Sequence, residues 1–436
     1  MSSIHWNVKH TVRLLSVLLT ASLFGMIGMS PATADGNPGL WYFDDYGVQQ
    51  AHDEGFTGKG VTIAIIDTPI YSDIPGLDSA DITVHEPGYC DISGTPGTRA
   101  PATSTDPRAS THGTEMALLI AGNGKGSNPG ETTARGVAPG AKINYYATSY
   151  REVDFVELSS DINCFRNGED GQEDSVIEAL SQALKDGADI ISMSFATGSS
   201  PKLEDLVSEA LKTGVILVSG TSNDKNRSMG MASFNGVVTM QSETKDSEIY
   251  ADAKKPDDSI TAVGPGVEVL GLDEHWGPKL ITGTSPSTAI TAGFLALVKS
   301  KYPSATGNQI IQSLIKNTGA SEHTVYYDPQ KYWGYGSMSL NQMLSFDPTN
   351  LPDINPLFNK LYGFPKYDDV FDEKISIPTT KETLAPSKET DTSILMLSIS
   401  LGGILLAGGA VFLIILLNSR RKRARNSLPS TFEKGL

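Results

Sequence analysis

The sequence of 436 residues is poor in cysteine and histidine, with only two of the former and seven of the latter. Two cysteines are too few for a structural zinc site, and no His/Glu pair stands at metal-ligand spacing. Because these ligand patterns are missing, we expect neither a metal nor a cofactor. The chain also lacks an internal repeat.

Basic residues are scarce as well: 34 Lys and Arg stand against 50 Asp and Glu, a net charge of −16. An acidic surface repels phosphate backbones, so nucleic-acid binding is not expected. The composition is globular, with 39% hydrophobic residues, 8% aromatics and 43 glycines. Disorder, collagen and a long coiled coil are thereby excluded as overall descriptions, and the length allows a large packed core.

Residues 1–34 have the pattern of a secretory signal peptide. Lys9 and Arg13 precede an apolar run over 14–29, and the triplet Ala32-Thr33-Ala34 places small residues where a signal peptidase cuts. An uncleaved membrane anchor is the alternative for the same run.

Residues 393–417, near the C-terminus, carry no charge. At about 1.5 Å of rise per residue, a helix of this length exceeds the roughly 30 Å of a bilayer core, so we predict one transmembrane helix. The tail over 418–436 begins with clustered cations that mark the cytoplasmic side: Arg420, Arg421, Lys422, Arg423 and Arg425. We expect a single-pass protein of the plasma membrane with its main domain outside.

The exported part, residues 35–392, is strongly acidic. Removing the two cations of 1–34, and the six cations and one anion of 418–436, leaves 26 basic against 49 acidic residues. Both cysteines, Cys90 and Cys164, lie in this part and so in an oxidising compartment, where a disulfide between them is the simplest expectation. Two free thiols are the alternative.

Periodic patterning ends near residue 345. We therefore assign 35–345 to the folded domain and 346–392 to its connection with the membrane. Within that connection, 346–371 holds four prolines and several aromatics and could pack on the domain as an extended strap. By contrast, 378–392 has the composition of a flexible stalk.

Short apolar strands alternate with helical stretches in the domain. The run 61–66 is unbroken in apolar and β-branched residues, as expected of a strand buried on both faces, and 142–147, 190–195 and 215–219 repeat the pattern. The segment 174–186 has apolar residues at helical spacing and ends before Gly187. This order predicts an α/β fold, a parallel sheet with helices on both faces, whose active site lies beyond the carboxyl ends of the strands.

Three reactive side chains stand where such a sheet would hold a site. Asp67 ends the first strand, whereas His112 and Ser285 each open a helical stretch, over 115–121 and 288–299. A loop-to-helix junction offers backbone N–H groups and the helix dipole to developing negative charge. Alone, Asp67 would more often be a local cap, but Asp, His and Ser in this chain order form a triad of the kind that subtilisin uses.

In such a triad the serine Oγ attacks the scissile carbonyl, and the histidine takes and then returns its proton. The aspartate fixes the imidazole tautomer and stabilises the imidazolium. The motifs around the three residues resemble those of the subtilisin-like (S8) serine proteases. They stand in the family's order: Lys59-Gly60-Val61 through Asp67-Thr68, His112-Gly113-Thr114, Gly136-Val137-Ala138-Pro139, Ser192-Met193-Ser194-Phe195, Gly264-Pro265-Gly266-Val267, and Gly283-Thr284-Ser285 with Gly293.

The resemblance implies a subtilisin-like fold that hydrolyses peptide bonds. It puts the oxyanion-hole amide at Asn223, which could instead be only a turn residue. It puts the substrate-lining strand at Ser194, Phe195 and Ala196, where a peptide would dock by β-augmentation.

Several residues depart from the family pattern. Pro69 stands where the family usually has Gly after the aspartate motif, Pro286 follows the serine, and Ser222 replaces a Gly before the oxyanion amide. Pro286 is tolerable in a first helical turn, because the N–H that it lacks would have no helical partner there. The departures suggest narrow specificity or weak activity.

The order of parts, with a signal, a protease-like domain, a proline-containing stalk, one span and a basic tail, resembles the mycosins. These are the membrane-anchored proteases of type VII secretion in actinobacteria, so the resemblance implies a membrane secretion complex as partner. The short stretch between Ala34 and the start of the fold leaves no room for the inhibitory propeptide that secreted subtilisins generally carry.

We therefore predict a membrane-anchored, extracytoplasmic serine endopeptidase that acts on polypeptides. A protease-fold scaffold that stabilises a membrane secretion complex, with catalysis weak or lost, is the alternative from another class. A stalked adhesin would suit the architecture but not the triad. The acidic run over 169–174 could bind calcium, although a solvated loop is the simpler interpretation because its spacing matches no EF-hand.

Overall fold

The computed structural model of the chain describes residues 37–371 apart from these positions: 93–94, 96, 150–161, 164–170, 196, 198, 224–229 and 361–362. The chain divides into a compact unit, Met1–Ile375, and a second unit, Ser376–Leu436, which lies wholly outside the described residues. The predicted signal peptide over 1–34 and the predicted span over 393–417 lie outside them as well. Within the described part of the chain, no helix is long and apolar enough to cross a bilayer.

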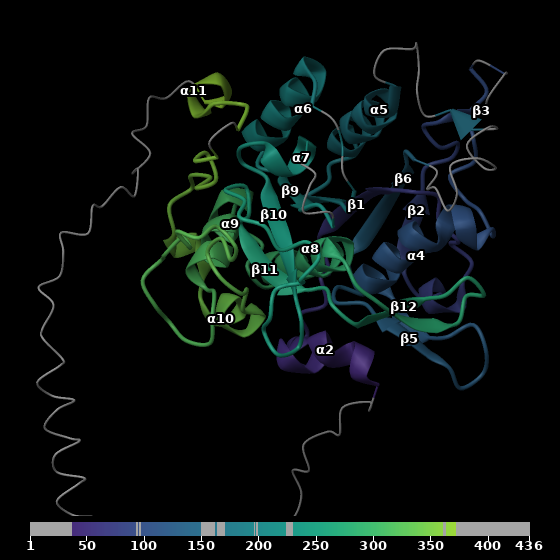
Figure 1. Cartoon of the computed structure of the whole chain (residues 1–436), viewed down its shortest axis with the longest axis horizontal. Helices are drawn as coiled ribbons and strands as arrows, with labels where there is room; N and C mark the ends of the chain where they lie inside the picture. The colour runs from purple at the N-terminus through teal and green to yellow at the C-terminus, as the bar shows by residue number, and fades with distance from the viewer. Residues whose placement is uncertain are drawn as a thin grey trace, which may run out of the picture. The chain divides into compact units, whose positions relative to one another are not determined.

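A parallel sheet forms the centre of the domain (Figure 1). Its seven strands are ordered β11-β10-β9-β8-β1-β6-β2, and every neighbouring pair is parallel. The strands are β1 (Thr62–Asp67), β2 (Asp81–Val84), β6 (Lys142–Ala147), β8 (Ile190–Met193), β9 (Ile216–Gly220), β10 (Val238–Glu243) and β11 (Ala262–Pro265). The predicted α/β fold with a parallel sheet is therefore confirmed.

Side chains of the central strand β1 alternate between two hydrophobic cores. Ile63 and Ile65 belong to the first core, and Ala64 and Ile66 to the second, because successive residues of a strand point to opposite faces. Burial on both faces explains why the strand is an unbroken apolar run in the sequence.

Helices complete both cores. The first core takes residues from α2 (Trp41–Asp45), α3 (Val48–Asp53), α4 (Pro107–Ala121), α8 (Thr284–Lys301), α9 (Gly307–Lys316) and α10 (Leu340–Ser345). The second takes residues from α5 (Gly171–Lys185), α6 (Pro201–Lys212) and α7 (Gly230–Ser233), which Figure 1 shows together on one side of the sheet.

The observed elements differ from the predicted ones mainly at their ends. Strand β6 has the predicted bounds, β1 and β9 are shifted by one residue, and β8 ends at Met193 rather than at Phe195. Both α4 and α8 begin before the apolar stretches that predicted them, because their first turns are polar. Gly187, with φ at 74°, follows α5 in the left-handed conformation that ends many helices.

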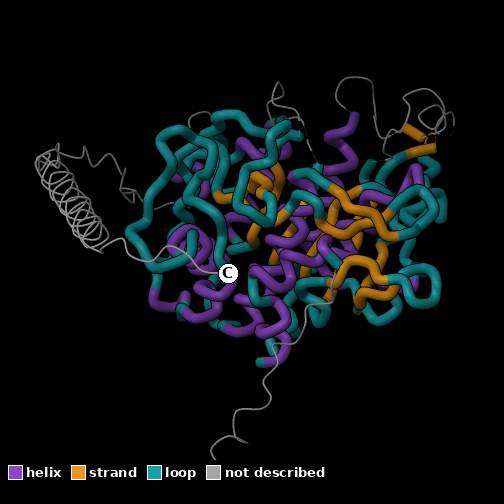
Figure 2. Tube along the Cα trace, turned by 60° about the horizontal axis from the view of Figure 1, so that its bottom comes forward, coloured by secondary structure: helices purple, strands orange, loops and turns teal. Residues whose placement is uncertain are grey.

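Three antiparallel ribbons and three short 3-10 turns complete the described elements. The ribbons pair β3 (Asp91–Ile92) with β7 (Ile162–Asn163), β4 (Asn123–Lys125) with β5 (Thr132–Arg135), and β12 (Val269–Leu272) with β13 (Pro278–Ile281). The turns are η2 (Pro38–Leu40), η3 (Pro75–Leu77) and η4 (Pro348–Asn350). Loops join these elements, and Figure 2 shows many of them along the outside of the trace.

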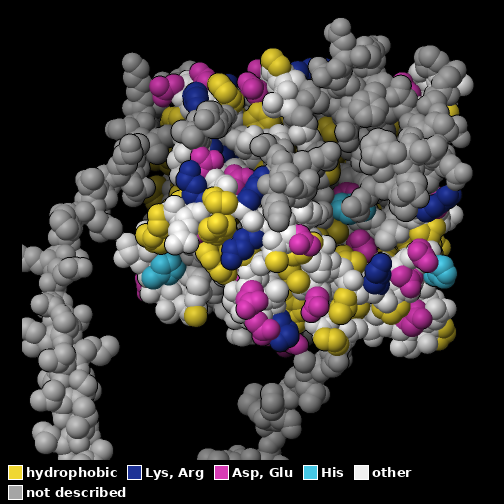
Figure 3. Space-filling view, in the orientation of Figure 1, with side chains coloured by type: hydrophobic (Ala, Val, Ile, Leu, Met, Phe, Trp, Pro, Cys, Tyr) yellow, Lys and Arg dark blue, Asp and Glu magenta, His cyan; other side chains and the backbone are white. Residues whose placement is uncertain are grey.

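Acidic and basic side chains are interspersed over the described residues of the face in Figure 3, rather than gathered into one large basic patch.

The strap segment 346–371 packs on the domain. Leu357 is 2% exposed in the first core, and Val370, from α11 (Tyr367–Val370), is 5% exposed in the second. The compact unit therefore extends past the domain boundary predicted at Ser345.

Lys360 of the strap is 6% exposed, which is unusual for a lysine. Its Nζ donates to three oxygens within 3.0 Å: Ala232 O, Val237 O and Thr239 Oγ1. Burial lowers the pKa of Lys360 to about 7, against the opposing effect of the charges on Asp257 and Asp258.

The buried amine makes the stability of the fold depend on pH. Between about pH 7 and 10.5 the unfolded chain keeps the proton on Lys360 and the folded chain loses it, so the free energy of unfolding rises with pH in this window. We expect Lys360→Met, which cannot titrate, to lose this rise in urea titrations across the window. If the free energy of unfolding rose equally with pH in both proteins, the pH dependence would not come from Lys360.

Candidate active site

Asp67 and His112 are joined directly. Asp67 is the last residue of β1 and is 1% exposed, and its Oδ1 lies 2.6 Å from His112 Nδ1. The same oxygen accepts the backbone N–H of Thr68 at 2.7 Å. An ionised carboxylate only accepts hydrogen bonds, so Nδ1 is the donor and Nε2 of the imidazole is left to take a proton.

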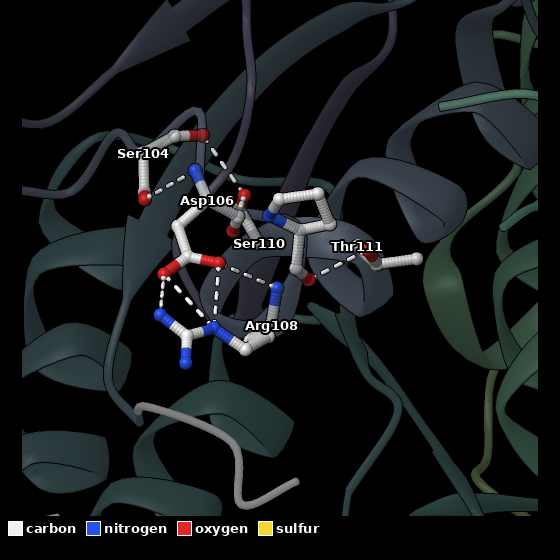
Figure 4. A network of polar contacts seen from close by, with 6 residues as sticks. Ser104, Asp106, Arg108, Ser110 and Thr111 are labelled. Atoms are coloured by element: carbon white, nitrogen blue, oxygen red, sulfur yellow. Dashed lines mark hydrogen bonds and ion pairs between the residues drawn. The ribbon is translucent and has the colours of Figure 1, made fainter. Parts of the chain in front are cut away.

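The helix that carries His112 is anchored at its first turn (Figure 4). Asp106 is the N-cap of α4, and its Oδ1 accepts the Arg108 N–H at 3.0 Å. The Arg108 guanidinium bonds the same carboxylate and holds the pKa of Asp106 below its usual range. Ser110 Oγ donates to Ser104 O and to Asp106 O, at 2.8 Å each. The N-cap of the helix is thereby fixed six residues before His112.

His112 lies inside its helix, as the sixth residue of α4, so the prediction that it opens the helix was wrong. The physical reason is the pair Asp106-Pro107, which supplies an N-cap and a proline at the first helical position and so starts the helix earlier. Helix-terminal N–H groups are therefore available near Ser285, but not at His112.

Gly113 lets α4 approach the end of β1. Its N–H donates to Thr68 Oγ1 at 3.0 Å, and a Cβ at this position would lie 2.7 Å from Thr68 O and 2.8 Å from Pro69 O. Tyr145 OH donates to the same Thr68 O at 2.6 Å. Burial, and then the charge of Asp67, raise the pKa of Tyr145 well above its usual value, so that this hydroxyl stays a donor.

Ser285 lies in the first turn of α8. Its Oγ donates to Ser194 O at 2.9 Å, and Ser194 Oγ donates to Ser285 O at 3.2 Å. Ser194 follows β8, which is paired in parallel with β1, so Ser194 and Asp67 lie at the same end of the sheet. The structure thus brings Ser285 to the end of the sheet that holds the Asp–His pair, with its hydroxyl bonded to Ser194 rather than to the imidazole.

Asn223 contacts the start of the same helix. Its Oδ1 accepts the Thr284 N–H at 2.8 Å and the Thr284 hydroxyl at 3.2 Å. Because the carbonyl oxygen is held in this way and the residue is exposed, its NH₂ group is left to donate beside Ser285. An amide so placed can stabilise an oxyanion.

The loop Gly264-Pro265-Gly266-Val267 holds the residue before α8. Gly283 N–H donates to Gly266 O at 2.9 Å, and Ser242 Oγ donates to Gly283 O at 2.6 Å. Pro286 occupies the first turn of α8, where its missing N–H costs no helical hydrogen bond.

The predicted substrate-lining strand is shorter than expected, because β8 ends at Met193. Ser194 is 5% exposed, Phe195 packs half-buried against the second core, and Ala196 lies outside the described residues. The backbone carbonyl of Ser194 bonds Ser285 instead of a neighbouring strand, which accounts for the early end of β8.

Cys90 is 1% exposed and is disulfide-bonded. Cys164 lies outside the described residues, so its pairing with Cys90 stays a prediction. Strand β7 ends at the residue before Cys164, and its pairing with β3 sets Asn163 opposite Asp91, the residue after Cys90. This antiparallel register supports the predicted pair.

Within the described residues, no group of three or more His, Cys, Asp or Glu could hold a metal ion. The side chains of the acidic run 169–174, for which calcium was considered, lie outside the described part.

Two residues that position the site were missed in the sequence. Asp106 was detectable, because Asp followed by Pro before a helical stretch is a helix-start signal. For Tyr145 the signal was weaker: a tyrosine on a buried strand must find a partner for its hydroxyl, but the pattern does not say which one.

A histidine oriented by a carboxylate and a serine at a helix start, both at one end of a parallel sheet, are the groups of a serine hydrolase of the triad type. The chain belongs to the subtilase family, whose model matches residues 58–342. The predicted resemblance to subtilisin-like serine proteases is therefore confirmed.

The thermostable alkaline protease of Halalkalibacterium halodurans is 30% identical over 279 residues, which are 63% of this chain and 66% of that protein. The chain spans 66%, 38% and 62% of the lengths of the first three curated relatives that it matches.

Solved structures share the fold. Fervidolysin from Fervidobacterium pennivorans has a TM-score of 0.54 at 21% identity, covering 73% of this chain and 48% of that chain. MycP1 from the ESX-1 type VII secretion system has a TM-score of 0.52 at 20% identity, covering 75% of this chain and 90% of that one.

The close approach at Gly113 is testable. We expect Gly113→Ala to push α4 away from Thr68 and Pro69, lowering the free energy of unfolding by about 1–3 kcal/mol and kcat/KM by roughly 10²-fold. Urea unfolding and peptide cleavage measure the two effects. Thr111→Ala, on the same helix, is the control, and equal behaviour of the two variants would refute the role of Gly113.

Proposed function

We propose that this chain is a serine endopeptidase that hydrolyses exposed polypeptides outside the membrane. The observation that carries the proposal is the 2.6 Å hydrogen bond between buried Asp67 and His112 Nδ1, at the end of the sheet where Ser285 lies in the first turn of α8. Because Nε2 of the histidine remains a proton acceptor, the pair can act as a general base. Membership in the subtilase family supports the same reaction.

In the first half-reaction, Ser285 Oγ attacks the scissile carbonyl carbon while its proton moves to His112 Nε2. The imidazolium is stabilised by Asp67, and the oxyanion by the NH₂ group of Asn223. His112 then gives the proton to the leaving amine as the C–N bond breaks. In the second half-reaction, water attacks the acyl carbon while His112 takes a proton from the water. The bond between the acyl carbon and Ser285 Oγ then breaks, and His112 returns the proton to Ser285 Oγ.

Substrate docking completes this arrangement. In the free enzyme the Ser285 hydroxyl donates to Ser194 O. A peptide that docks in extended form along this segment offers its own N–H groups to backbone carbonyls such as that of Ser194. We infer that docking releases the serine hydroxyl toward His112, so that attack follows binding.

A catalytically weak scaffold is the second candidate, and one observation favours it. The Ser285 hydroxyl bonds a backbone carbonyl instead of the imidazole, and Pro286 follows it directly. Catalytic hydrogen bonds are often incomplete before substrate binds, so the geometry alone does not exclude a working enzyme.

The proposal includes the position of the domain. The apolar segments 14–29 and 393–417, with the cations that follow the second, support export of the domain and its tethering to the plasma membrane. The fold that the chain shares with MycP1, described as part of a type VII secretion system, supports a membrane secretion complex as partner.

A membrane-impermeant fluorophosphonate probe tests the reaction and the topology together. Intact cells that express the full chain should be labelled at Ser285, because the probe reacts only with an activated serine and reaches only an external domain. Ser285→Ala should abolish labelling and change the free energy of unfolding by no more than about 1 kcal/mol. Labelling only after lysis would refute the topology, and no labelling of the folded wild type would favour the scaffold.

The amide of Asn223 is tested by kinetics. Asn223→Ala should lower kcat by roughly 10²–10³ with little change in KM, because an oxyanion donor acts in the transition state. The exposed Asn128→Ala, in the loop between β4 and β5, is the matched control and should keep wild-type rates. If KM rises while kcat is unchanged, Asn223 binds substrate instead.

A further inference from the structure

The buried lysine of the strap ties together elements that lead to the substrate-lining segment. Lys360 Nζ donates to Ala232 O in α7 at 2.8 Å and to Thr239 Oγ1 in β10 at 3.0 Å. Thr239 Oγ1 donates in turn to Ala232 O at 2.8 Å. A third bond from Nζ reaches Val237 O at 3.0 Å. The Lys360 side chain thus joins the end of α7 to the start of β10.

The other end of α7 holds the segment that follows Ser194. Gly230 N–H donates to Thr197 O at 3.0 Å, and Met231 N–H donates to Thr197 Oγ1 at 3.2 Å. Both Met231 and Ala232 are 1% exposed, so α7 is packed between the two sets of contacts rather than lying free on the surface. A shift of α7 would therefore move Thr197, three residues beyond the carbonyl that bonds Ser285.

The strap forms further hydrogen bonds with the turn between α7 and β10. Asn235 Nδ2 donates to Gly363 O and Pro365 O at 2.9 Å each, and Asn235 Oδ1 accepts the Lys360 N–H at 3.2 Å. Gly236 N–H donates to Leu357 O at 2.9 Å. Because these bonds are made with backbone groups, the strap fixes the path of the turn and Lys360 fixes α7 relative to it.

We propose that Lys360 is a positioning residue for peptide binding: it holds α7, and through α7 it holds Thr197, three residues after Ser194, where an extended substrate docks. The inference rests on the proposed endopeptidase function and names the support of that same site. By this proposal the C-terminal strap supports substrate binding, although it contributes no group to the reaction itself.

The geometry sets a specific expectation for substrates of different length. A peptide that runs along Ser194–Thr197 depends on the position of that segment, whereas a small ester that reaches only the serine does not. Loss of Lys360 should therefore affect long substrates more than short ones. A merely structural defect would reduce the fraction of folded enzyme, and so lower both rates equally.

The experiment compares Lys360→Met with the wild type in the full chain. Lys366→Met is the control, because the side chain of this exposed strap lysine donates to Gly363 O and lies over the ring of Phe364, both within the strap. The substrates are succinyl-Ala-Ala-Pro-Phe p-nitroanilide and acetyl-Phe p-nitrophenyl ester, with active enzyme counted by fluorophosphonate titration. We expect kcat/KM to fall roughly 10-fold for the tetrapeptide, mainly through KM, and less than about 2-fold for the ester. Equal losses on both substrates, or none, would overturn the proposal.

Hydrogen–deuterium exchange separates this inference from the proposed function. Peptides that cover Ser194–Thr197 and Gly230–Thr239 should exchange about 10-fold faster in Lys360→Met and at wild-type rates in Lys366→Met. If the wild type proves inactive, unchanged exchange at Ser194–Thr197 still refutes the link, and faster exchange still supports it. Should Lys360→Met fail to fold, Thr239→Val removes one acceptor while keeping the shape, and the same pattern is expected at smaller size.

Discussion

The approach of α4 to the end of β1 is the constraint on which the candidate site depends. The imidazole of His112 reaches the carboxylate of Asp67 only because the next residue, Gly113, has no Cβ to meet the carbonyls of Thr68 and Pro69. The hydroxyl of Tyr145 and the N–H of Gly113 both bond Thr68, so that the contact is hydrogen-bonded as well as tightly packed. A buried carboxylate is tolerated there because it is partnered by a donor that the helix holds in place.

The serine side of the site is positioned by a different set of hydrogen bonds. Gly283 is held by Gly266 and Ser242, and Thr284 is held by Asn223, so the first turn of α8 is fixed by side chains and loops from neighbouring strands. The result is a helix start that is fixed at Ser285. The two halves are joined through the sheet, because Ser194 follows the strand next to β1.

The strap extends this support to the far side of the sheet. Removing a lysine side chain from water costs free energy. The three hydrogen bonds of Lys360 offset part of that cost. Its partners lie in α7, at the residue before β10 and in β10 itself, on the stretch of chain that continues from Asn223. Catalytic domain and strap are therefore one folded unit, and changes in the strap reach the site through α7.

Much of this protein could be predicted from local patterns. The unbroken apolar runs predicted the parallel strands, because a strand covered on both faces has no polar side, and the motif order predicted Asp67, His112 and Ser285. The early end of β8 and the packing of the strap could not be predicted this way, since each depends on partners distant in the sequence: Ser194 on Ser285, and Lys360 on Ala232 and Thr239. The earlier start of α4 was missed although its signal, Asp106-Pro107, is local. The sequence by itself determined which chemical groups are present and which strands are buried, because burial and reactivity are properties of single residues and their near neighbours. Only the tertiary structure decided how those groups are aimed, because the hydrogen bonds that orient them join segments that meet after folding.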